Sequence, residues 1–246
     1  FSRGDSDISF TEIIDSPLIR HVSKTHANEI TEDVSDRIWA LLGQSIHTIL
    51  ERANLTGLVE QRVGWTFDGT KLSGQFDHLE NGILTDYKVT SVWSVIYGKE
   101  SWEDQLNVLA YLCYLNNLKV EKLQIVAILR DWQKSKAMDE SYPSTQVITV
   151  PIPLWDEVRQ EKYVDERLAE HFSLPPTCSD VERWKKDDTW AVMKKGRKSA
   201  LRVLDSEDEA KLWMKDNGGD EIVHRPGLFN RCGSYCNVRP FCPNYK

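Results

Sequence analysis

Two carboxylates and an ammonium group follow one another closely between residues 74 and 88. The segment reads Gly74-Gln-Phe-Asp77, then eight residues, then Asp86-Tyr-Lys88. Carboxylate oxygens are the ligands that Mg²⁺ and Mn²⁺ prefer, and a lysine beside them can orient or help to deprotonate an attacking water. This combination indicates metal-assisted hydrolysis of a phosphodiester.

A β-hairpin would bring these groups together. Residues 72–79 and 83–90 both alternate loosely between apolar and polar types, and Asn81-Gly82 suits the positive φ angles of a tight turn. Asp86 and Lys88 are two residues apart, so they share one face of their strand. The alternative interpretation is an ordinary surface hairpin with scattered charges.

A histidine upstream adds a nitrogen donor. Residues 29–54 carry apolar side chains at helical spacing, and Gly43, His47 and Glu51 lie along one stripe of that helix. A glycine there would let the helix approach a sheet, and neutral imidazole is a suitable metal ligand. The alternative is a surface pair between His47 and Glu51. A second acid, Glu60, could lie near the metal from the strand that starts at Leu58, but we interpret it as strand surface.

In their order along the chain, these motifs resemble those of the PD-(D/E)XK nuclease superfamily. The resemblance covers residues 9–132 and is to the RecB-like branch, which includes CRISPR-adaptation nucleases and many phage exonucleases. It implies a restriction-endonuclease-like core. The motifs that carry it are Gly43-x3-His47-x2-Leu50-Glu51, Gly74-x2-Asp77, Asp86-Tyr87-Lys88 and Gln105.

The resemblance also implies a role for each of these polar residues. Lys88 would position the water and stabilise developing charge, while Gln105 would orient Lys88 or the scissile phosphate. The implied catalytic residues are Asp77, Asp86, Lys88 and Gln105. The implied ligands of Mg²⁺ or Mn²⁺ are His47, Asp77, Asp86 and the carbonyl of Tyr87.

One position departs from the pattern of these nucleases. They usually carry Gln-x3-Tyr on the helix after the catalytic strand, and here the residue four after Gln105 is Leu109. Tyr111, six residues after Gln105, would lie about 120° away around an ideal helix. We therefore interpret Tyr111 as a packing residue. The departure bears on how a DNA strand is positioned and leaves the metal ligands unchanged.

Composition limits the classes of protein to consider. The chain has 246 residues, enough for one substantial core and a smaller appendage. Its net charge of −7 does not indicate nucleic-acid binding, although a groove that binds phosphates needs only a local positive potential. No stretch is apolar enough to cross a bilayer, and no secretory signal is visible. We expect a cytoplasmic protein of a bacterial or phage-infected cell.

The pattern of expected elements favours an α/β (α+β) fold with a mixed central sheet flanked by helices. A short helix is expected near 10–15 and a long helix over 29–54. Strands and helices are then expected up to residue 172. We expect three parts: a nuclease core over 1–173, a ββα appendage over 174–225, and a Cys-rich segment over 226–246 that packs back on the core. The expected elements after residue 54 are strands at 57–67, 70–78, 83–90, 122–130 and 147–152 and helices at 102–117 and 155–172.

The appendage has a basic tip. Two strands are expected on either side of Gly196, followed by a helix over 207–216. Cations at the turn could grip the phosphate backbone without reading sequence, or they could simply be a solvated hairpin tip. The predicted DNA-binding residues are Lys194, Lys195, Arg197 and Lys198.

The C-terminal cysteines raise a second metal question. Cys232-x3-Cys236-x5-Cys242 is dense enough for an iron–sulfur cluster or zinc. Iron–sulfur members of the resembled branch have three such cysteines and one upstream of the histidine motif, and here no cysteine precedes His47. Cys178 could supply the fourth thiolate of a [4Fe-4S] cluster or a Zn²⁺ site, or His224 could supply an imidazole to zinc. The alternatives are reduced cysteines left from a lost site, or a disulfide.

The predicted function is a metal-dependent exonuclease that hydrolyses phosphodiester bonds at DNA ends or in single strands. DNA is the expected partner, without a membrane. The chain has no phosphate-binding loop of the Gly-x4-Gly-Lys-[Ser/Thr] type, so any helicase or recombination partner would be a separate protein. The rival function is a non-catalytic nucleic-acid-binding or assembly subunit that keeps the nuclease fold.

Overall fold

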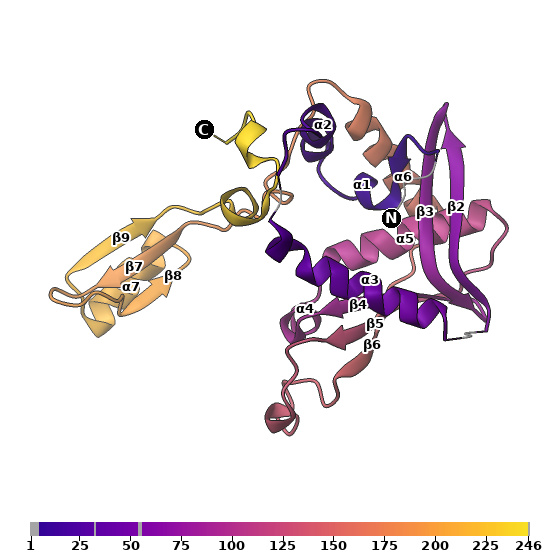
Figure 1. The fold of residues 1–246 in the computed structure, drawn as a ribbon. Coiled ribbons are helices and arrows are strands. Elements are labelled where there is room, and N and C mark those ends of the chain that lie inside the picture. Colours follow the sequence, from indigo (N-terminus) through magenta and orange to yellow (C-terminus); the bar gives the residue numbers. More distant parts are fainter. Residues whose placement is uncertain (1–4, 32, 54–55, 246) are drawn as a thin grey trace. The chain divides into compact units, whose positions relative to one another are not determined.

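The computed structural model describes residues 5–31, 33–53 and 56–245, and the chain divides into two compact units (Figure 1). Unit 1 comprises Phe1–Arg20 and Thr31–Pro176, and unit 2 comprises His21–Ile30 and Thr177–Lys246. Residues 226–245 thus group with the appendage, and whether they pack on the core stays a prediction. Each unit is built around its own β-sheet.

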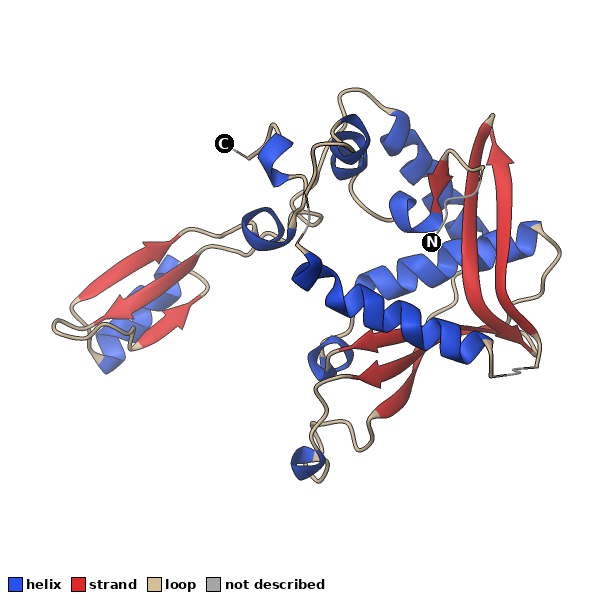
Figure 2. Ribbon diagram, in the orientation of Figure 1, coloured by secondary structure: helices blue, strands red, loops and turns tan. Residues whose placement is uncertain are grey.

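Unit 1 contains a six-stranded mixed sheet, as the sequence predicts. The strand order is β1-β3-β4-β5-β6, and β2 pairs with β3. The β1–β3 and β4–β5 pairs are parallel, and the other pairs are antiparallel. Figure 2 shows β2 and β3 as a long curved hairpin. The strands are β1 (Ile8–Ser9), β2 (Leu58–Phe67), β3 (Thr70–Glu80), β4 (Ile83–Thr90), β5 (Lys122–Leu129) and β6 (Val147–Ile152).

Helices flank this sheet, and α5 supplies much of the core. It contacts every strand from β2 to β6, and most of its buried residues are apolar. Leu109 of α5 packs against β3 where β3 has Gly74, because a Cβ there would lie only 2.6 Å from a Leu109 methyl carbon. The helices wholly in unit 1 are α1 (Phe10–Ile13), α3 (Ile38–Glu51), α4 (Val92–Ile96), α5 (Glu100–Leu115) and α6 (Glu157–Phe172), with short 3₁₀ turns η1 (Val34–Arg37) and η2 (Lys134–Lys136).

Two expectations about the N-terminal third are wrong. Helix α2 (Pro17–Thr25) is not among the elements that the sequence predicted. Helix α3 is shorter than the expected 29–54 helix, and none of its residues is buried. A Cβ at Gly43 would meet nothing within 4 Å, so this glycine does not serve close packing on the sheet. The apolar spacing predicted the helix but not its surroundings.

Unit 2 contains a three-stranded antiparallel sheet in the order β8-β7-β9. The expected strand pair and helix are present as β7 (Thr189–Met193), β8 (Arg202–Leu204) and α7 (Glu207–Asn217). Strand β9 (Glu221–Arg225) was not predicted. The C-terminal segment is irregular, with short turns η3 (Arg231–Tyr235) and η4 (Arg239–Phe241). Among the described helices of both units, none has the length and apolar character to cross a membrane.

Candidate metal centre

Three side chains from three elements of unit 1 converge. His47 of α3, Glu60 of β2 and Asp77 of β3 offer ligand atoms that all lie within 4.8 Å of one another. His47 Nδ1 is 3.4 Å from Asp77 Oδ1 and 3.4 Å from Glu60 Oε1. One imidazole and two carboxylates are suitable ligands for a divalent ion such as Mg²⁺ or Mn²⁺. The predicted meeting of His47 and Asp77 is present.

The position of Asp77 follows from the point where two strands separate. The β3–β4 pairing includes only the three residue pairs next to the turn, starting at His78↔Thr85. The predicted tight turn is present, with φ of +50° at Asn81 and +75° at Gly82. Beyond the pairing, the backbone N–H of Tyr87 donates to Asp77 Oδ2 at 2.7 Å. A backbone donor that lost its ladder partner therefore holds the carboxylate in place.

Glu60 is a member of the candidate group, although the sequence analysis preferred to interpret it as strand surface. Its neighbours Val59 and Gln61 pair with His78 and Phe76, but Glu60 itself has a φ of +51°. Such a conformation costs a residue other than glycine about 1–3 kcal/mol and is found most often at functional sites. Its other carboxylate oxygen accepts a bond from the Gln75 amide at 2.7 Å. Alternation of side chains does not reveal a reversed φ, so the sequence could name Glu60 as a possible neighbour of the metal but could not establish its position.

Asp86, Lys88 and Gln105 form a second group on the adjacent strand. Lys88 Nζ and Gln105 Nε2 each donate to Asp86 Oδ1 at 2.9 Å, so the predicted shared face of Asp86 and Lys88 is confirmed. Asp86 is only 4% exposed. Its Oδ2 lies 2.9 Å from Lys88 Nζ but accepts no hydrogen bond from any described residue. Lys88 therefore lies against both carboxylate oxygens of Asp86, and a metal ion at Oδ2 would share that oxygen with the ammonium.

The charges of the two groups interact. Burial raises the pKa of Asp86 to about 6, although Lys88 acts in the opposite direction. Burial also raises the pKa of Glu60. The hydrogen bond to Asp77, together with the negative charges of Asp77, Glu60 and Asp86, raises the pKa of His47 to about 9. Several acids held together and partly removed from water form an environment that a divalent cation would stabilise.

Two aromatic predictions have different outcomes. Tyr111 is 5% exposed and stacks on Phe67 at a centroid distance of 6.1 Å, so its interpretation as a packing residue is confirmed. Leu109, at the position of the expected tyrosine, lies in the core against Gly74. The assignment of the Tyr87 carbonyl as a ligand stays a prediction.

The predicted sites of unit 2 are less organised. The C-terminal segment and Cys178 contribute half-buried thiols that are in no disulfide, but across residues 5–31, 33–53 and 56–245 they form no convergent group like that at His47. Burial, with a smaller effect of Cys242 and Cys232, raises the pKa of Cys236. A cluster or zinc at Cys178, Cys232, Cys236 and Cys242 stays a prediction. The basic tip residues Lys194, Lys195, Arg197 and Lys198 are all exposed.

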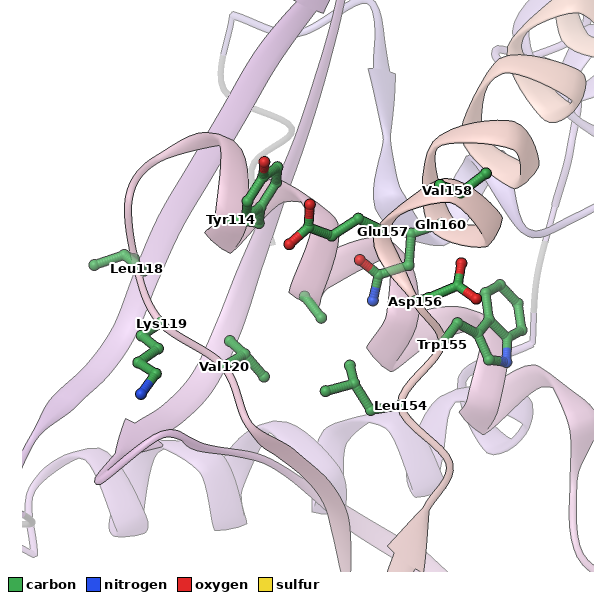
Figure 3. Close-up of a pocket in the computed structure, with 11 residues that line it drawn as sticks. Tyr114, Leu118, Lys119, Val120, Leu154, Trp155, Asp156, Glu157, Val158 and Gln160 are labelled. Carbon is green, nitrogen blue, oxygen red and sulfur yellow. The ribbon is translucent and has the colours of Figure 1, made fainter.

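A separate cavity of about 600 Å³ lies between the end of α5 and the start of α6 (Figure 3). It shares no residue with the His47 group or with Asp86, Lys88 and Gln105. Its lining combines an apolar floor with a few polar groups. The labelled side chains are Tyr114, Leu118, Lys119, Val120, Leu154, Trp155, Asp156, Glu157, Val158 and Gln160.

Comparison with known proteins shows similarity of fold alone. No protein-family model and no curated protein sequence matches the chain. The crystal structure of SSO0001 is similar, with a TM-score of 0.50 and 15% identity over 75% of this chain and 84% of that one. A candidate exonuclease from Eubacterium rectale has a TM-score of 0.31 and 14% identity over 62% of this chain and 57% of that one. The second likeness is too weak to support an argument.

Proposed function

We propose that this chain is a metal-dependent nuclease that hydrolyses phosphodiester bonds at DNA ends or in single strands. One observation carries the proposal: His47, Glu60 and Asp77 converge within 4.8 Å, and the Asp86–Lys88 pair lies on the adjoining strand. Three ligands on separate elements, followed by an acid and an amine, form an arrangement suited to hydrolysis of a phosphate ester.

The residues present fit a divalent cation. His47, Glu60 and Asp77 would hold it together with Asp86, whose buried Oδ2 accepts no hydrogen bond from the described residues. When bound, Mg²⁺ or Mn²⁺ would supply Lewis-acid chemistry, polarising the phosphate and lowering the pKa of water.

The protein's own groups have distinct tasks. Gln105 and Lys88 both donate to Asp86 Oδ1, which fixes the orientation of that carboxylate. The Lys88 side chain keeps 27% of its surface exposed, so its ammonium is within reach of a substrate. An ammonium has three donors, and the bond to Asp86 uses one. The remaining donors can bind a phosphate oxygen and stabilise the charge that develops there.

Contact with the DNA backbone is part of the proposal. Lys194, Lys195, Arg197 and Lys198 surround Gly196, whose φ of +83° closes the turn. These four side chains are exposed and make no ion pair with any described residue. Cations that no carboxylate neutralises are available to phosphates.

A cleavage assay tests the function. End-labelled single-stranded and duplex DNA are incubated with the protein and either Mn²⁺ or EDTA, and the products are separated by size. We expect cleavage with Mn²⁺ alone, and a loss of at least about 10²-fold in Lys88→Ala. Lys71→Ala, which removes an exposed lysine at the far end of β3, is the matched control and should cleave normally.

The same assay separates the rival function. A non-catalytic binding or assembly subunit would retain DNA in a filter-binding experiment but leave the label intact with every divalent ion. Equal cleavage by wild type and Lys88→Ala would also reject the proposed site, because it would place the activity elsewhere.

A further inference from the structure

Two strands of unit 1 end together beside Lys88. Strands β4 and β5 are parallel and paired up to Thr90↔Leu129, so their C-terminal ends lie at one edge of the sheet. The Arg130 N–H donates to the Thr90 carbonyl at 2.9 Å. Since Lys88 lies two residues before Thr90, Arg130 begins the chain segment directly beside the proposed catalytic lysine.

Lys99 completes a group of cations at this edge. Partial loss of water, followed by the positive charges of Arg130 and Lys88, lowers the pKa of Lys99. Lys99 is also the N-cap residue of α5, three residues after the end of α4. Within the part of the chain that the structure describes, Lys99 and Arg130 have no carboxylate partner, whereas Lys88 is bonded to Asp86.

This grouping is unusual for the surface that carries it. Residues 1–176 contain 17 Lys and Arg against 27 Asp and Glu. Because acidic residues outnumber basic ones, two cations without a carboxylate partner are unexpected in this part of the chain. An anionic ligand would remove the repulsion between them.

Arg130 is held in a defined orientation. Its guanidinium carbon lies 4.1 Å from the ring centroid of Trp39 on α3. Such stacking fixes the plane of the guanidinium and leaves its edge donors for a phosphate. Trp39 and His47 are eight residues apart on the same helix, about 12 Å along its axis. Phosphates in a strand follow one another every ~3.4 Å of helix rise, so a few nucleotides would connect the two points.

An aromatic pair lies on the neighbouring helix. Helix α4 starts at this edge, where the Val92 N–H donates to the carboxylate of Asp131 at 2.8 Å. Trp93 and Tyr97 stack with a centroid distance of 5.7 Å and an interplanar angle of 14°. They remain 54% and 79% exposed. The pair therefore contributes little to the core and presents flat apolar rings to solvent, beside cations that fit phosphate.

We propose that Lys99 and Arg130 hold a phosphate of the incoming strand and that Trp93 and Tyr97 stack on an unpaired base, so that the chain selects single-stranded DNA. The selectivity rests on the proposed function, since the strand held here would be the one presented to Lys88. Stacking requires a base released from its pair, and a duplex does not offer one.

Binding measured without cleavage tests this proposal separately from the nuclease activity. In EDTA, fluorescence anisotropy gives the affinity for three labelled probes of one length: a single strand, a blunt duplex and an abasic strand with the same phosphates. We expect Trp93→Ala to weaken binding of the single strand by about tenfold and to leave the abasic strand unaffected. Trp93→Phe should restore most of the loss, and Trp65→Ala, which removes a 45% exposed tryptophan of β2, should have no effect.

The cations have a different signature. Lys99→Gln should weaken the single and abasic strands equally and reduce the slope of log affinity against log salt by about 0.7. Three results would overturn the proposal: no binding of the single strand by wild type, equal loss of the abasic strand in Trp93→Ala, or binding of the blunt duplex as tight as that of the single strand. Failure of the nuclease assay alone, with this binding pattern intact, would reject the proposed catalysis and not the strand-binding surface.

Discussion

The two regions of the molecule that the sequence marks for metal binding are organised very differently. In unit 1, His47, Glu60 and Asp77 come from a helix and two paired strands, and their ligand atoms already lie within 4.8 Å. In unit 2, Cys232 lies within the short turn η3 and Cys236 directly follows it, and the thiols form no convergent group among the described residues. Density of ligands along the sequence is greater in the second region, yet only the first is assembled.

The difference lies in what holds each side chain. Asp77 is fixed by the Tyr87 N–H, and Glu60 by the Gln75 amide. Both partners belong to the sheet, so the ligands keep their places without an ion. Cys232 and Cys236 lie at a short turn outside any strand, so we expect that an ion would itself have to bring the thiols together. A preorganised site is expected to lose and regain its metal without unfolding. A site whose ligands are brought together by the metal is expected to lose its structure when the metal is removed.

The largest expected effect concerns the preorganised ligand Asp77. Asp77→Asn should lower the rate of Mn²⁺-dependent cleavage by at least about 10³-fold, because it removes a charge from the ion's coordination. Single-turnover cleavage and calorimetric Mn²⁺ titration measure the loss. Asp165→Asn, an equal charge change on the exposed side of α6, is the control. Undiminished Mn²⁺ binding by Asp77→Asn would contradict a preorganised metal site at Asp77.

Metal removal sharpens the contrast. EDTA should abolish cleavage, and restored Mn²⁺ should recover it, while the circular dichroism spectrum and protease resistance of unit 1 remain unchanged. If residues 232–242 bind zinc or an iron–sulfur cluster, stripping it should instead expose that segment to protease. Elemental analysis of the purified protein shows which metal is present. If unit 1 of the metal-free protein becomes sensitive to protease, the acidic centre also needs its metal to assemble.

The framework of unit 1 should depend on pH through His171. Its Nε2–H donates to the carbonyls of Ile13 and Asp15, both at 3.1 Å, and burial followed by the charge of Arg167 lowers its pKa to about 4. Between pH 6.5 and 4 the unfolded chain binds a proton that the native imidazole refuses. The free energy of unfolding therefore decreases by about 3 kcal/mol as the pH falls through this window. Below pH 4 the titration of His171 causes no further loss.

Urea unfolding at pH 7 and pH 4.5 measures this loss. His171→Gln should show a smaller decrease between the two pH values than wild type, because the glutamine does not titrate. The unit 2 transition should be the same in both proteins. An identical pH dependence in wild type and His171→Gln would contradict the assignment.

Glu60 allows a finer test of the strained ligand. Glu60→Gln keeps the shape and the Gln75 contact but removes the charge, and we expect Mn²⁺ affinity to fall by about tenfold. Glu121→Gln, at an exposed carboxylate paired with Lys119, is the matched control. Cys236→Ser should leave the Mn²⁺ affinity unchanged. A change of the same size in Cys236→Ser would mean that the two regions are coupled.

The smallest effects test whether the two units unfold separately. Asp156 caps α6 by accepting the Arg159 N–H at 2.8 Å, and Ser206 caps α7 by accepting the Glu209 N–H at 3.2 Å. Asp156→Ala and Ser206→Ala should each cost about 1 kcal/mol. Calorimetry should show the first change only in the unit 1 transition and the second only in that of unit 2. A single transition that both variants lower equally would show one cooperative unit.

Much of the acidic site was predictable because strand geometry is local. The two-residue period places Asp86 and Lys88 on one face, and Asn81-Gly82 fixes the turn that brings Asp77 near them. The strand over residues 122–129 was also predictable from its alternation, which matches its buried positions.

What escaped prediction depends on distant contacts. Glu60 acts through a backbone angle of +51° that no side-chain pattern encodes. The apolar spacing of α3 suggested a buried stripe, yet Trp39 and Ile49 remain exposed at 52% and 64%. Strand β9 is short, and pairing with β7 rather than its own composition establishes it.

The way the two units share the chain limits how the molecule can be dissected. Residues 21–30 group with unit 2 although residues on both sides of them belong to unit 1, and the ring of His26 stacks on Phe241 at 4.4 Å. A fragment ending at residue 176 would keep every strand of the six-stranded sheet but strip residues 21–30 of their partners. A fragment starting at residue 31 would lack the parallel strand β1. Neither cut therefore gives a self-contained module, and moving either unit onto another protein would require both of its chain segments.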